Sequence, residues 1–366
     1  MRRILVVKLA DIGDVLTATP ALRALRRTFP HAHITALIPP HCRELLEGSP
    51  LVNELILLDK RQFDTFGGTL KAGMPLALAR VAARLRGGRF DAVLMLHHLT
   101  TPWGAAKYAA LALASGAAVR AGLDNGRGWF LTHRARDHGF GVRHEVEYCN
   151  DVVGLIGAKP DYGPMEFPLV PEDMAYAQTL LPSEKHRIAL HAGSGAYSLA
   201  RRWPLERFSA LARQLASKLG AHIILVGGSD EVELSRVIAA ELGDASLDLT
   251  GSTTLHQLGA VLKSCDLFVG NDSGVMHLAT AVGTPVVAIF GPSNHRAWGP
   301  WAPARVGAPA YRTGRPAVVL RADLPCMPCF YTAQGLGTPE GCPNRTCLQL
   351  VTPQQVAKIV EDLLAS

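Results

Sequence analysis

The sequence lacks any apolar run that approaches the roughly 20 residues needed to span a bilayer. Aromatic residues make up only 6% of the chain and do not interleave with basic residues, which disfavours a nucleic-acid-binding protein. No short internal repeat or low-complexity segment is present. Lys8 and Asp11 interrupt the basic and apolar start of the chain, so we expect a buried first strand there and a cytoplasmic protein.

An acidic excess is also absent. The 37 Lys and Arg residues outnumber the 31 Asp and Glu residues, for a net charge of +6. The first 170 residues contain 21 basic and 15 acidic side chains, so they carry the whole excess. A basic lobe attracts nucleic acid, an anionic membrane surface or an acidic substrate, unless it is only a solvated surface.

The seven cysteines are unevenly spread. Four of them fall in one stretch rich in Pro and Gly, as Cys326, Cys329, Cys342 and Cys347. The C-x2-C spacing of the first pair suits a zinc knuckle, whereas the second pair has C-x4-C spacing. A reducing cytoplasm disfavours disulfides. The sequence therefore leaves open whether these four cysteines bind a structural metal.

Apolar runs alternate with amphipathic segments in the first half of the chain. Strands are indicated at 4–7, 33–38, 55–58 and 91–96, and helices at 20–27 and 75–85. Such alternation is typical of parallel βαβ units. Five prolines punctuate the chain between about 160 and 185, where we expect the interdomain connection.

A second alternating series follows this connection. Its strands are expected at 187–191, 222–226, 266–269 and 285–290, and its helices at 204–219, 275–282 and 352–364. The sequence therefore predicts an α/β fold of two Rossmann-like domains facing a cleft. The expected divisions are an N-terminal domain over 1–170, a linker over 171–185, a C-terminal domain over 186–351 and a C-terminal helix over 352–366.

The segment from Gly270 to His277 lies where a strand ends and a helix begins. Unpaired N–H groups and the positive end of the helix dipole make such a place an anion site. Asp272 precedes Ser273, which adds a hydroxyl donor, and Gly274 lets a diphosphate approach the backbone. His277 falls on the first helical turn. The alternative is an ordinary Asp or Ser N-cap.

Two further segments point to ligand binding in the second half. Gly193 and Ser194 lie in a Gly-rich turn after the first strand, which has the composition of a phosphate-contacting loop. Arg201 and Arg202 precede a helix, where the dipole slightly disfavours cations. A guanidinium here can neutralise the charge on a leaving diphosphate, although a solvated pair is the alternative.

In the first half, Asp11 and Asp14 flank Gly13 at the first strand-to-helix turn. Asp14 is placed to deprotonate an acceptor hydroxyl, and Gly13 leaves room for a sugar above the backbone. N-capping by either carboxylate is the alternative.

These blocks together resemble glycosyltransferase family 9, the ADP-heptose:lipopolysaccharide heptosyltransferases. The likeness rests on Asp-Ser-Gly-Val-Met-His from Asp272, on Gly-Thr-Pro-Val-Val-Ala-Ile-Phe-Gly-Pro from Gly283, and on the segment from Gly13 to Leu22. The four clustered cysteines are similar to the family's C-terminal loop. The sequence departs from the family at Val275, often Pro, and in a longer segment before Arg201.

The resemblance implies a glycosyltransferase B-type fold, with the acceptor bound by the first domain and the donor by the second. It implies an inverting transfer without metal or cofactor, with Asp14 as general base and Arg201, or less directly Arg202, on the diphosphate. The donor residues it implies are Gly13, Gly193, Ser194, Arg202, Glu231, Asp272, Ser273, Gly274 and His277. Asp230 is an alternative to Glu231 at the ribose.

The implied donor is ADP-heptose and the implied acceptor is the anionic inner core of lipopolysaccharide, with peripheral contact to the inner membrane. Arg61, Arg120 and His144 are the acceptor-binding candidates, with Glu145 beside His144, and Arg23, Arg26 and Arg27 extend the basic surface. A related transferase with another donor or acceptor is one alternative. A nucleotide-sugar 2-epimerase, which needs no acceptor, and an inert carbohydrate-binding protein are the others.

Overall fold

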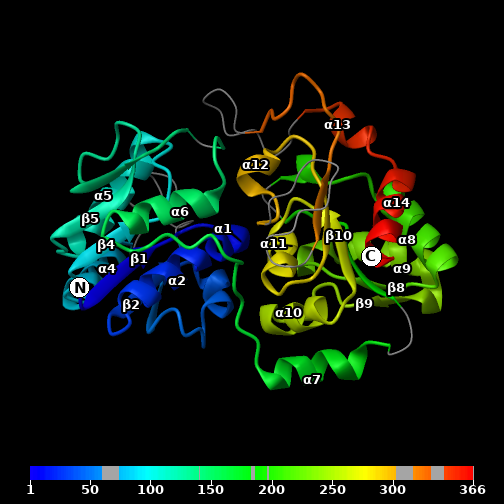
Figure 1. The fold of residues 1–366 in the computed structure, drawn as a ribbon, viewed down its shortest axis with the longest axis horizontal. Helices are drawn as coiled ribbons and strands as arrows, with labels where there is room; N and C mark the ends of the chain where they lie inside the picture. Colours follow the sequence, from blue (N-terminus) through cyan, green and yellow to red (C-terminus); the bar gives the residue numbers. More distant parts are fainter. Residues whose placement is uncertain are drawn as a thin grey trace. The chain divides into compact units, whose positions relative to one another are not determined.

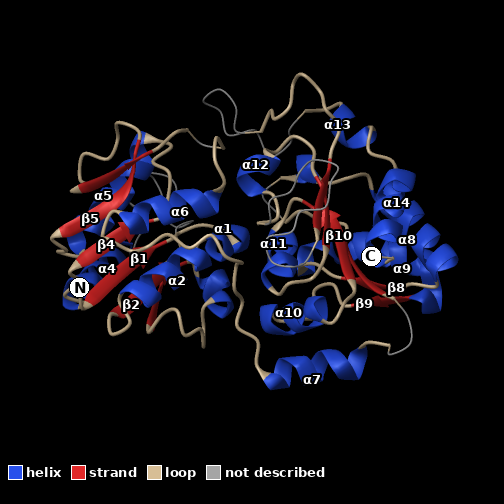
Figure 2. Ribbon diagram, in the orientation of Figure 1, coloured by secondary structure: helices blue, strands red, loops and turns tan. Residues whose placement is uncertain are grey.

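The computed structural model describes residues 1–59, 74–139, 141–182, 186–195, 198–301, 316–330 and 342–365. It divides into two compact units, unit 1 from Met1 to Gly163 and unit 2 from Pro164 to Ser366. Each unit is built around its own parallel sheet, coloured red in Figure 2. Among the described residues, no helix is long and apolar enough to cross a membrane.

Unit 1 contains a six-stranded parallel sheet in the order β3-β2-β1-β4-β5-β6. Its strands are β1 (Arg3–Val7), β2 (His33–Ile38), β3 (Glu54–Leu57), β4 (Ala92–Met95), β5 (Val119–Asp124) and β6 (His133–Arg136). Its helices are α1 (Ile12–Thr17), α2 (Thr19–Thr28), η1 (Pro40–Leu45), α4 (Met74–Gly87), α5 (Pro102–Ala114) and α6 (Glu145–Gly154).

Helices cover both faces of the unit 1 sheet. Leu85 of α4 and Ala112 of α5 belong to one buried cluster with strand residues such as Leu5 and Val93. Helices α1, α2 and α6 pack against one another, and α6 also contacts β4 and β5. Because neighbouring residues of a buried strand point to opposite faces, both faces need apolar cover, which explains the continuous apolar runs.

Unit 2 repeats this architecture, with the order β12-β11-β10-β7-β8-β9 and parallel pairing throughout. Its strands are β7 (Arg187–His191), β8 (His222–Leu225), β9 (Ser246–Asp248), β10 (Leu267–Asn271), β11 (Val286–Ile289) and β12 (Ala317–Leu320). Its helices are α7 (Pro171–Leu180), α8 (Leu205–Leu219), α9 (Val232–Leu242), α10 (Leu255–Lys263), α11 (Gly274–Ala281), α12 (His295–Trp298), α13 (Thr346–Gln349) and α14 (Pro353–Leu364). The described residues of unit 2 also include the short 3-10 turns η3 (Leu199–Arg201), η4 (Ser229–Glu231) and η5 (Gly243–Ala245).

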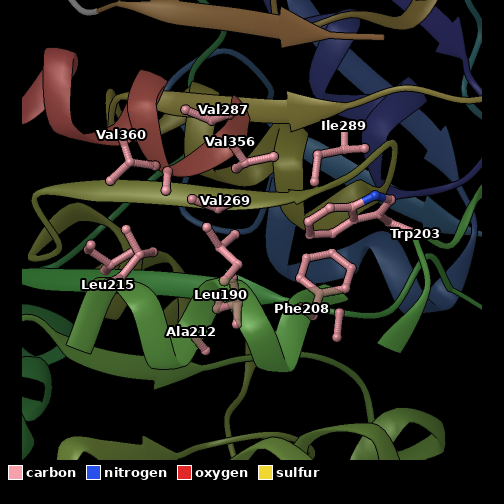
Figure 3. Close-up of a cluster of buried hydrophobic side chains, with 14 of the residues drawn as sticks. Leu190, Trp203, Phe208, Ala212, Leu215, Val269, Val287, Ile289, Val356 and Val360 are labelled. Atoms are coloured by element: carbon pink, nitrogen blue, oxygen red, sulfur yellow. The ribbon is translucent and has the colours of Figure 1, made fainter. Parts of the chain in front are cut away.

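The core of unit 2 lies between its sheet and the helices α8, α9 and α14 (Figure 1). Trp203 and Phe208 meet edge to face, with ring centroids 5.0 Å apart, beside Ile289 of the sheet (Figure 3). The Trp203 indole N–H donates to the Val351 carbonyl at 3.0 Å, so the ring is both buried and satisfied. This packing anchors the segment that carries Arg201 and Arg202.

The observed division falls after Gly163, earlier than the expected domain end at 170. Most of the expected linker over 171–185 is the helix α7, which packs against α10 within unit 2. Pro171 occupies the first helical position, where a proline is tolerated because its missing N–H would have had no intrahelical partner.

Candidate active site

The candidate donor-binding residues of unit 2 gather at the carboxyl ends of β7, β8 and β10. After β7 the chain forms β8 and β9 on one side and then crosses to β10 on the other, so β7 and β10 flank the topological switch point. Ligands of open α/β sheets bind at this place because the connections on either side diverge. The same argument places the β1 and β4 ends at the switch point of unit 1.

The loop after β7 is held by a residue that the sequence did not single out. The Asn271 amide donates to the carbonyls of Ala192 and Gly193, at 3.1 and 2.8 Å. The Asn271 carbonyl accepts from the Trp203 N–H at 2.9 Å. Asn271 is fully buried at the end of β10, so it fixes both ends of the Gly193-to-Trp203 segment. Its partners lie 68 to 79 residues away in the chain, so no local sequence pattern could have indicated this role.

Glu231 forms a buried hub beneath this loop. One carboxylate oxygen accepts from His191 Nε2 at 2.8 Å and from the Gly228 N–H at 3.0 Å. The other accepts from the Gly195 N–H at 2.9 Å. Burial alone would raise the pKa of Glu231, but these hydrogen bonds outweigh it and lower the pKa to about 2. Its assignment to the donor ribose stays a prediction.

Gly193 is required by this hub. A Cβ added at Gly193 would lie 1.8 Å from a carboxylate oxygen of Glu231. Any larger residue would therefore displace the carboxylate. The loop glycine thus serves close packing as well as the predicted approach to a phosphate.

The start of α11 forms the second wall of the donor site. Ser273 is the N-cap, and its hydroxyl accepts from the Met276 N–H. His191 Nδ1 lies 3.1 Å from the same hydroxyl, so Ser273 is joined to Glu231 through one imidazole. Ser273 is thus an N-cap, and its contact with a donor stays a prediction. Gly274 follows as the first residue of the helix, and its role in binding stays a prediction.

The two arginines lie between the loop and α11. Arg201 Nη2 donates to the Ser194 carbonyl at 3.0 Å, and its Nη1 lies 3.4 Å from Asp272 Oδ2. Arg202 Nε donates to the Ser194 hydroxyl at 3.2 Å, and its Nη2 lies 3.5 Å from Glu231. Both side chains are less than one-fifth exposed, so neither is the solvated surface group that was the alternative.

His277 lies on the first turn of α11, and its residue is 4% exposed. Its Nδ1 has no hydrogen-bond partner among the described residues. Burial lowers the pKa of His277 to about 4, with Asp272 opposing and Arg201 adding to the effect. A neutral imidazole with an unsatisfied ring nitrogen beside Arg201 is chemically suited to a polar ligand.

In unit 1, Asp14 occupies the first turn of α1 with an intermediate exposure, behind the buried Gly13. Asp11 holds the N-cap position, but its side chain makes no capping hydrogen bond within the described part of the chain. It lies 3.4 Å from His41 Nε2 instead. The alternative for this pair was N-capping by Asp11 or Asp14, and the Asp11 half of it does not hold for the Asp11 side chain.

The predicted acceptor-binding residues have varied environments. Arg61 lies outside the described residues. The Arg120 guanidinium donates to the carbonyls of Phe130 and Ala117, and His144 Nδ1 accepts from the Val146 N–H as the N-cap of α6. Both have structural partners, and their contact with an acceptor stays a prediction.

The predicted basic surface needs one correction. Arg23 is only 8% exposed and binds Asp161 through two nitrogens, at 2.8 and 2.9 Å. Arg27 also pairs with Asp161, and Arg26 donates to the carbonyl of Ala32. Arg23 therefore holds the end of unit 1 in place and does not face a ligand.

Unit 1 contains a cavity and unit 2 an unsatisfied hydroxyl outside the residues described so far. An apolar cavity of about 410 Å³ lies between α4 and α5. Leucine and alanine side chains dominate its walls, so it lacks the polar groups that a nucleotide diphosphate needs. The Ser293 hydroxyl, buried beyond β11, has no partner among the described residues, a signal absent from the sequence pattern. Within the described ranges, no three His, Cys, Asp or Glu side chains are grouped to hold a metal.

Two Rossmann-like units, each with a six-stranded sheet of parallel strands, are the architecture of the glycosyltransferase B-type fold. The family model described as glycosyltransferase family 9 (heptosyltransferase) matches residues 78–330. The chain therefore belongs to glycosyltransferase family 9 and is a glycosyltransferase, as the sequence predicted.

Individual relatives agree with this membership. Lipopolysaccharide heptosyltransferase 2 of Salmonella typhimurium is 28% identical over 306 residues, covering 80% of this chain and 83% of that protein. A family 9 glycosyltransferase structure from Veillonella parvula is 26% identical with a TM-score of 0.76, covering 100% and 97% of the two chains. The structure of E. coli ADP-heptose lps heptosyltransferase II has a TM-score of 0.73 at 24% identity, covering 100% and 99%.

Proposed function

We propose that this enzyme transfers a heptose from ADP-heptose to the inner core of lipopolysaccharide, with inversion and without a metal ion. Family membership and the printed functions of the relatives support the heptosyl donor and the lipopolysaccharide acceptor. The observation that carries the proposal is the cationic and polar arrangement at the start of α11. There Arg201, Ser273 and the unsatisfied His277 Nδ1 come together.

In this proposal unit 2 binds the donor diphosphate. The N–H groups at the start of α11 and the helix dipole favour an anion. Arg201 and Arg202 add two guanidinium groups, which are held in place by Ser194. Positive charge that a divalent cation supplies in other enzymes is thus available from side chains, and charge develops there as the diphosphate leaves.

Asp14 of unit 1 acts as the general base. The acceptor hydroxyl gives its proton to the Asp14 carboxylate while its oxygen forms a bond to the anomeric carbon. The bond from that carbon to the ADP oxygen breaks, and its electron pair leaves with the diphosphate. A single displacement of this kind inverts the anomeric configuration, and a positioned base contributes about 10²–10⁴ to the rate.

The acceptor assignment rests on charge. Inner-core lipopolysaccharide is anionic, and the excess basic charge of the chain lies within its first 170 residues. We place the reaction at the cytoplasmic face of the inner membrane, with peripheral contact through unit 1. Arg61, Arg120 and His144 remain the acceptor-binding candidates.

Calorimetric titration with ADP, UDP, GDP and dTDP, in the presence of a chelator, tests the donor. The expected result is binding of ADP at least about tenfold tighter than of the other nucleotides, a difference of about 1.4 kcal/mol. Tighter binding of UDP, or binding only after divalent metal is added, would overturn the proposal. Conversion of free nucleotide sugar without any acceptor would instead indicate an epimerase.

A further inference from the structure

Three buried side chains of unit 2 form a hydrogen-bonded row that ends at the proposed diphosphate site. Glu231 Oε2 lies 2.8 Å from His191 Nε2, and His191 Nδ1 lies 3.1 Å from the Ser273 hydroxyl. The three residues are between 1 and 4% exposed. They come from three separate places, which are η4, the end of β7 and the N-cap of α11. The row therefore joins a buried carboxylate to the hydroxyl at the start of α11.

The carboxylate fixes which nitrogen of His191 carries hydrogen. Burial alone would raise the pKa of Glu231, but its hydrogen bonds to His191 and to two backbone N–H groups lower it to about 2. An ionised carboxylate only accepts hydrogen bonds, so His191 Nε2 carries a hydrogen and donates it. The other ring nitrogen, Nδ1, is therefore bare in the neutral imidazole and protonated only in the imidazolium.

The Ser273 hydroxyl has a single hydrogen to donate. Its oxygen already accepts from the Met276 N–H at 3.3 Å, as the N-cap of α11. Beside a neutral His191, the bare Nδ1 takes the hydroxyl hydrogen, and no hydrogen is left for a ligand. Beside an imidazolium the direction reverses, because Nδ1–H donates to the Ser273 oxygen and the hydroxyl hydrogen is released. Ser273 is thus a donor toward a diphosphate only when His191 is protonated.

Other titratable groups lie on the elements around His191: Asp230, which is exposed, on η4, Glu233 and Arg236, which pair with each other, on α9, Asp248, which accepts from the Thr250 N–H, on β9, Asp272 after β10, His277 on α11, and Arg201 and Arg202 at the end of η3. The two arginines lie near carboxylates. Arg201 Nη1 lies 3.4 Å from Asp272 Oδ2, and Arg202 Nη2 lies 3.5 Å from the Glu231 oxygen that does not bind His191. Among the described residues, Glu231 and Ser273 are the side chains hydrogen-bonded to the two ring nitrogens of His191.

We propose that His191 is a positioning residue for donor binding and takes up one proton when the diphosphate binds. The proton comes from solvent to Nδ1, Nδ1–H donates to the Ser273 oxygen, and the hydroxyl turns its hydrogen toward a diphosphate oxygen. The imidazolium also adds a positive charge to those of Arg201 and Arg202, where negative charge develops as the diphosphate leaves. This inference rests on the proposed function, which places the donor diphosphate at the start of α11.

The first test counts protons. Calorimetric titration with ADP-heptose, without acceptor and in buffers of different ionisation enthalpy, gives the number of protons taken up on binding. Both phosphates of this donor are esterified, so the ligand itself does not titrate near neutral pH. Wild type should take up as much as one proton, and its affinity should fall by up to about tenfold per pH unit between about pH 6 and 9. Binding without proton uptake throughout this range overturns the inference.

The variant His191→Asn removes the titrating group. Asparagine retains a neutral amide near Ser273 but cannot gain a proton, so both the uptake and the pH dependence of affinity should disappear. A structural role alone would weaken binding equally at every pH. His186→Asn is the matched control, because His186 is exposed at the other end of β7, and it should retain the uptake of wild type. A folded His191→Asn with wild-type uptake overturns the inference.

The variant His277→Asn distinguishes between the two imidazoles of the site. His277 Nδ1 has no hydrogen-bond partner among the described residues, and burial lowers the pKa of His277 to about 4, so this ring competes as a proton acceptor. The proposal predicts that proton uptake persists in His277→Asn, although the affinity changes. Uptake that disappears in His277→Asn and persists in His191→Asn overturns the inference.

A second readout needs neither a nucleotide nor a variant. NMR of the enzyme with nitrogen-15-labelled histidine distinguishes ring nitrogens with and without hydrogen, and inorganic pyrophosphate serves as the ligand. At a pH where Nδ1 of His191 is bare in the free enzyme, pyrophosphate should convert it to the protonated form while Nε2 stays protonated. An Nδ1 that is protonated before ligand is added at every pH, or that stays bare in excess pyrophosphate, overturns the inference. If ADP-heptose does not bind, the proposed function fails, whereas the pyrophosphate titration still decides the role of His191.

Discussion

At the scale of single residues, the two carboxylates of the first turn have different surroundings. Asp11 is exposed and lies near His41, whereas Asp14 is partly buried in the first turn of α1. The sequence predicted Asp14 as the base but could not separate the pair by environment. Elsewhere in unit 1, Glu145 forms a buried ion pair with Lys8 at 3.3 Å and lies 3.0 Å from His98. Glu145 is 137 residues from Lys8 and 47 residues from His98 in the chain, so these contacts depend on the order of strands in the sheet.

Asp14→Asn should reduce kcat for heptosyl transfer by about 10²–10⁴, because the amide cannot accept the acceptor proton. Binding of ADP, measured by calorimetry, should stay within about twofold of wild type. Asp11→Asn serves as the matched control and should keep most of the activity. Equal loss of transfer and ADP binding in Asp14→Asn would indicate a structural role and contradict the assignment.

Arg201→Ala should weaken ADP binding by about 10- to 100-fold and slow transfer, since a charge-assisted contact to the diphosphate is lost. Arg202→Ala should weaken it less, because Arg202 is already engaged by Ser194 and lies close to Glu231. Calorimetry and steady-state kinetics of the two variants compare them directly. If only Arg202→Ala were impaired, the diphosphate role would move to Arg202.

At the scale of elements, buried strands were predicted well. The expected strands 33–38 and 187–191 coincide with β2 and β7, because continuous apolar runs mark strands covered on both faces. Four of the described strands were missed. The edge strands β6 and β9 have no apolar run, since their sequences are His-Arg-Ala-Arg and Ser-Leu-Asp, and β5 mixes polar and apolar residues. The edge strand β12 was missed although its sequence, Ala-Val-Val-Leu, is apolar. Helix α5 was missed because it is apolar around most of its circumference and shows little helical periodicity.

The site was predictable to a similar degree. Residues at strand-to-helix turns, such as Ser273 and Gly193, carry a local signal. The hubs that hold them, Asn271 and the His191–Glu231 pair, depend on contacts across 40 residues or more. Their function in the fold could not be inferred without the sheet order.

Gly193→Ala should weaken ADP binding by about tenfold or more. The new Cβ would displace the Glu231 carboxylate from His191 and from the Gly195 N–H, and the loop would lose its support. Gly154→Ala is the matched control, because nothing lies within 4 Å of a Cβ at the end of α6. Calorimetry of both variants checks this, and wild-type affinity in a folded Gly193→Ala would refute the loop's role.

At the scale of the whole molecule, each unit has its own buried ion pairs and its own response to pH. Burial alone would lower the pKa of His98, but its hydrogen bonds to Asp137 and Glu145 raise it from an ordinary 6.5 to about 9. The folded unit 1 therefore binds a proton that the unfolded chain releases. The resulting stability is complete below about pH 6.5 and is lost as the pH rises toward 9. The assignment of acceptor and donor binding to the two units stays a prediction.

His98→Gln should therefore show less loss of stability than wild type between pH 6.5 and 9. The difference is at most about 3 kcal/mol, from the size of the shift. Urea unfolding monitored by hydrogen exchange of β1 and β4 measures it within unit 1. An identical pH dependence in both proteins would show that His98 is not protonated as described.

Heptosyl transfer itself is the most direct test of the account. The purified chain is incubated with ADP-heptose and a lipopolysaccharide acceptor that lacks its inner-core heptose residues, in the presence of a chelator, and products are followed by mass spectrometry. The account predicts heptosylated acceptor and ADP in equal amounts, with no product from UDP-linked or GDP-linked sugars. No heptosylated product, or transfer only from another nucleotide sugar or only with added metal, would contradict it.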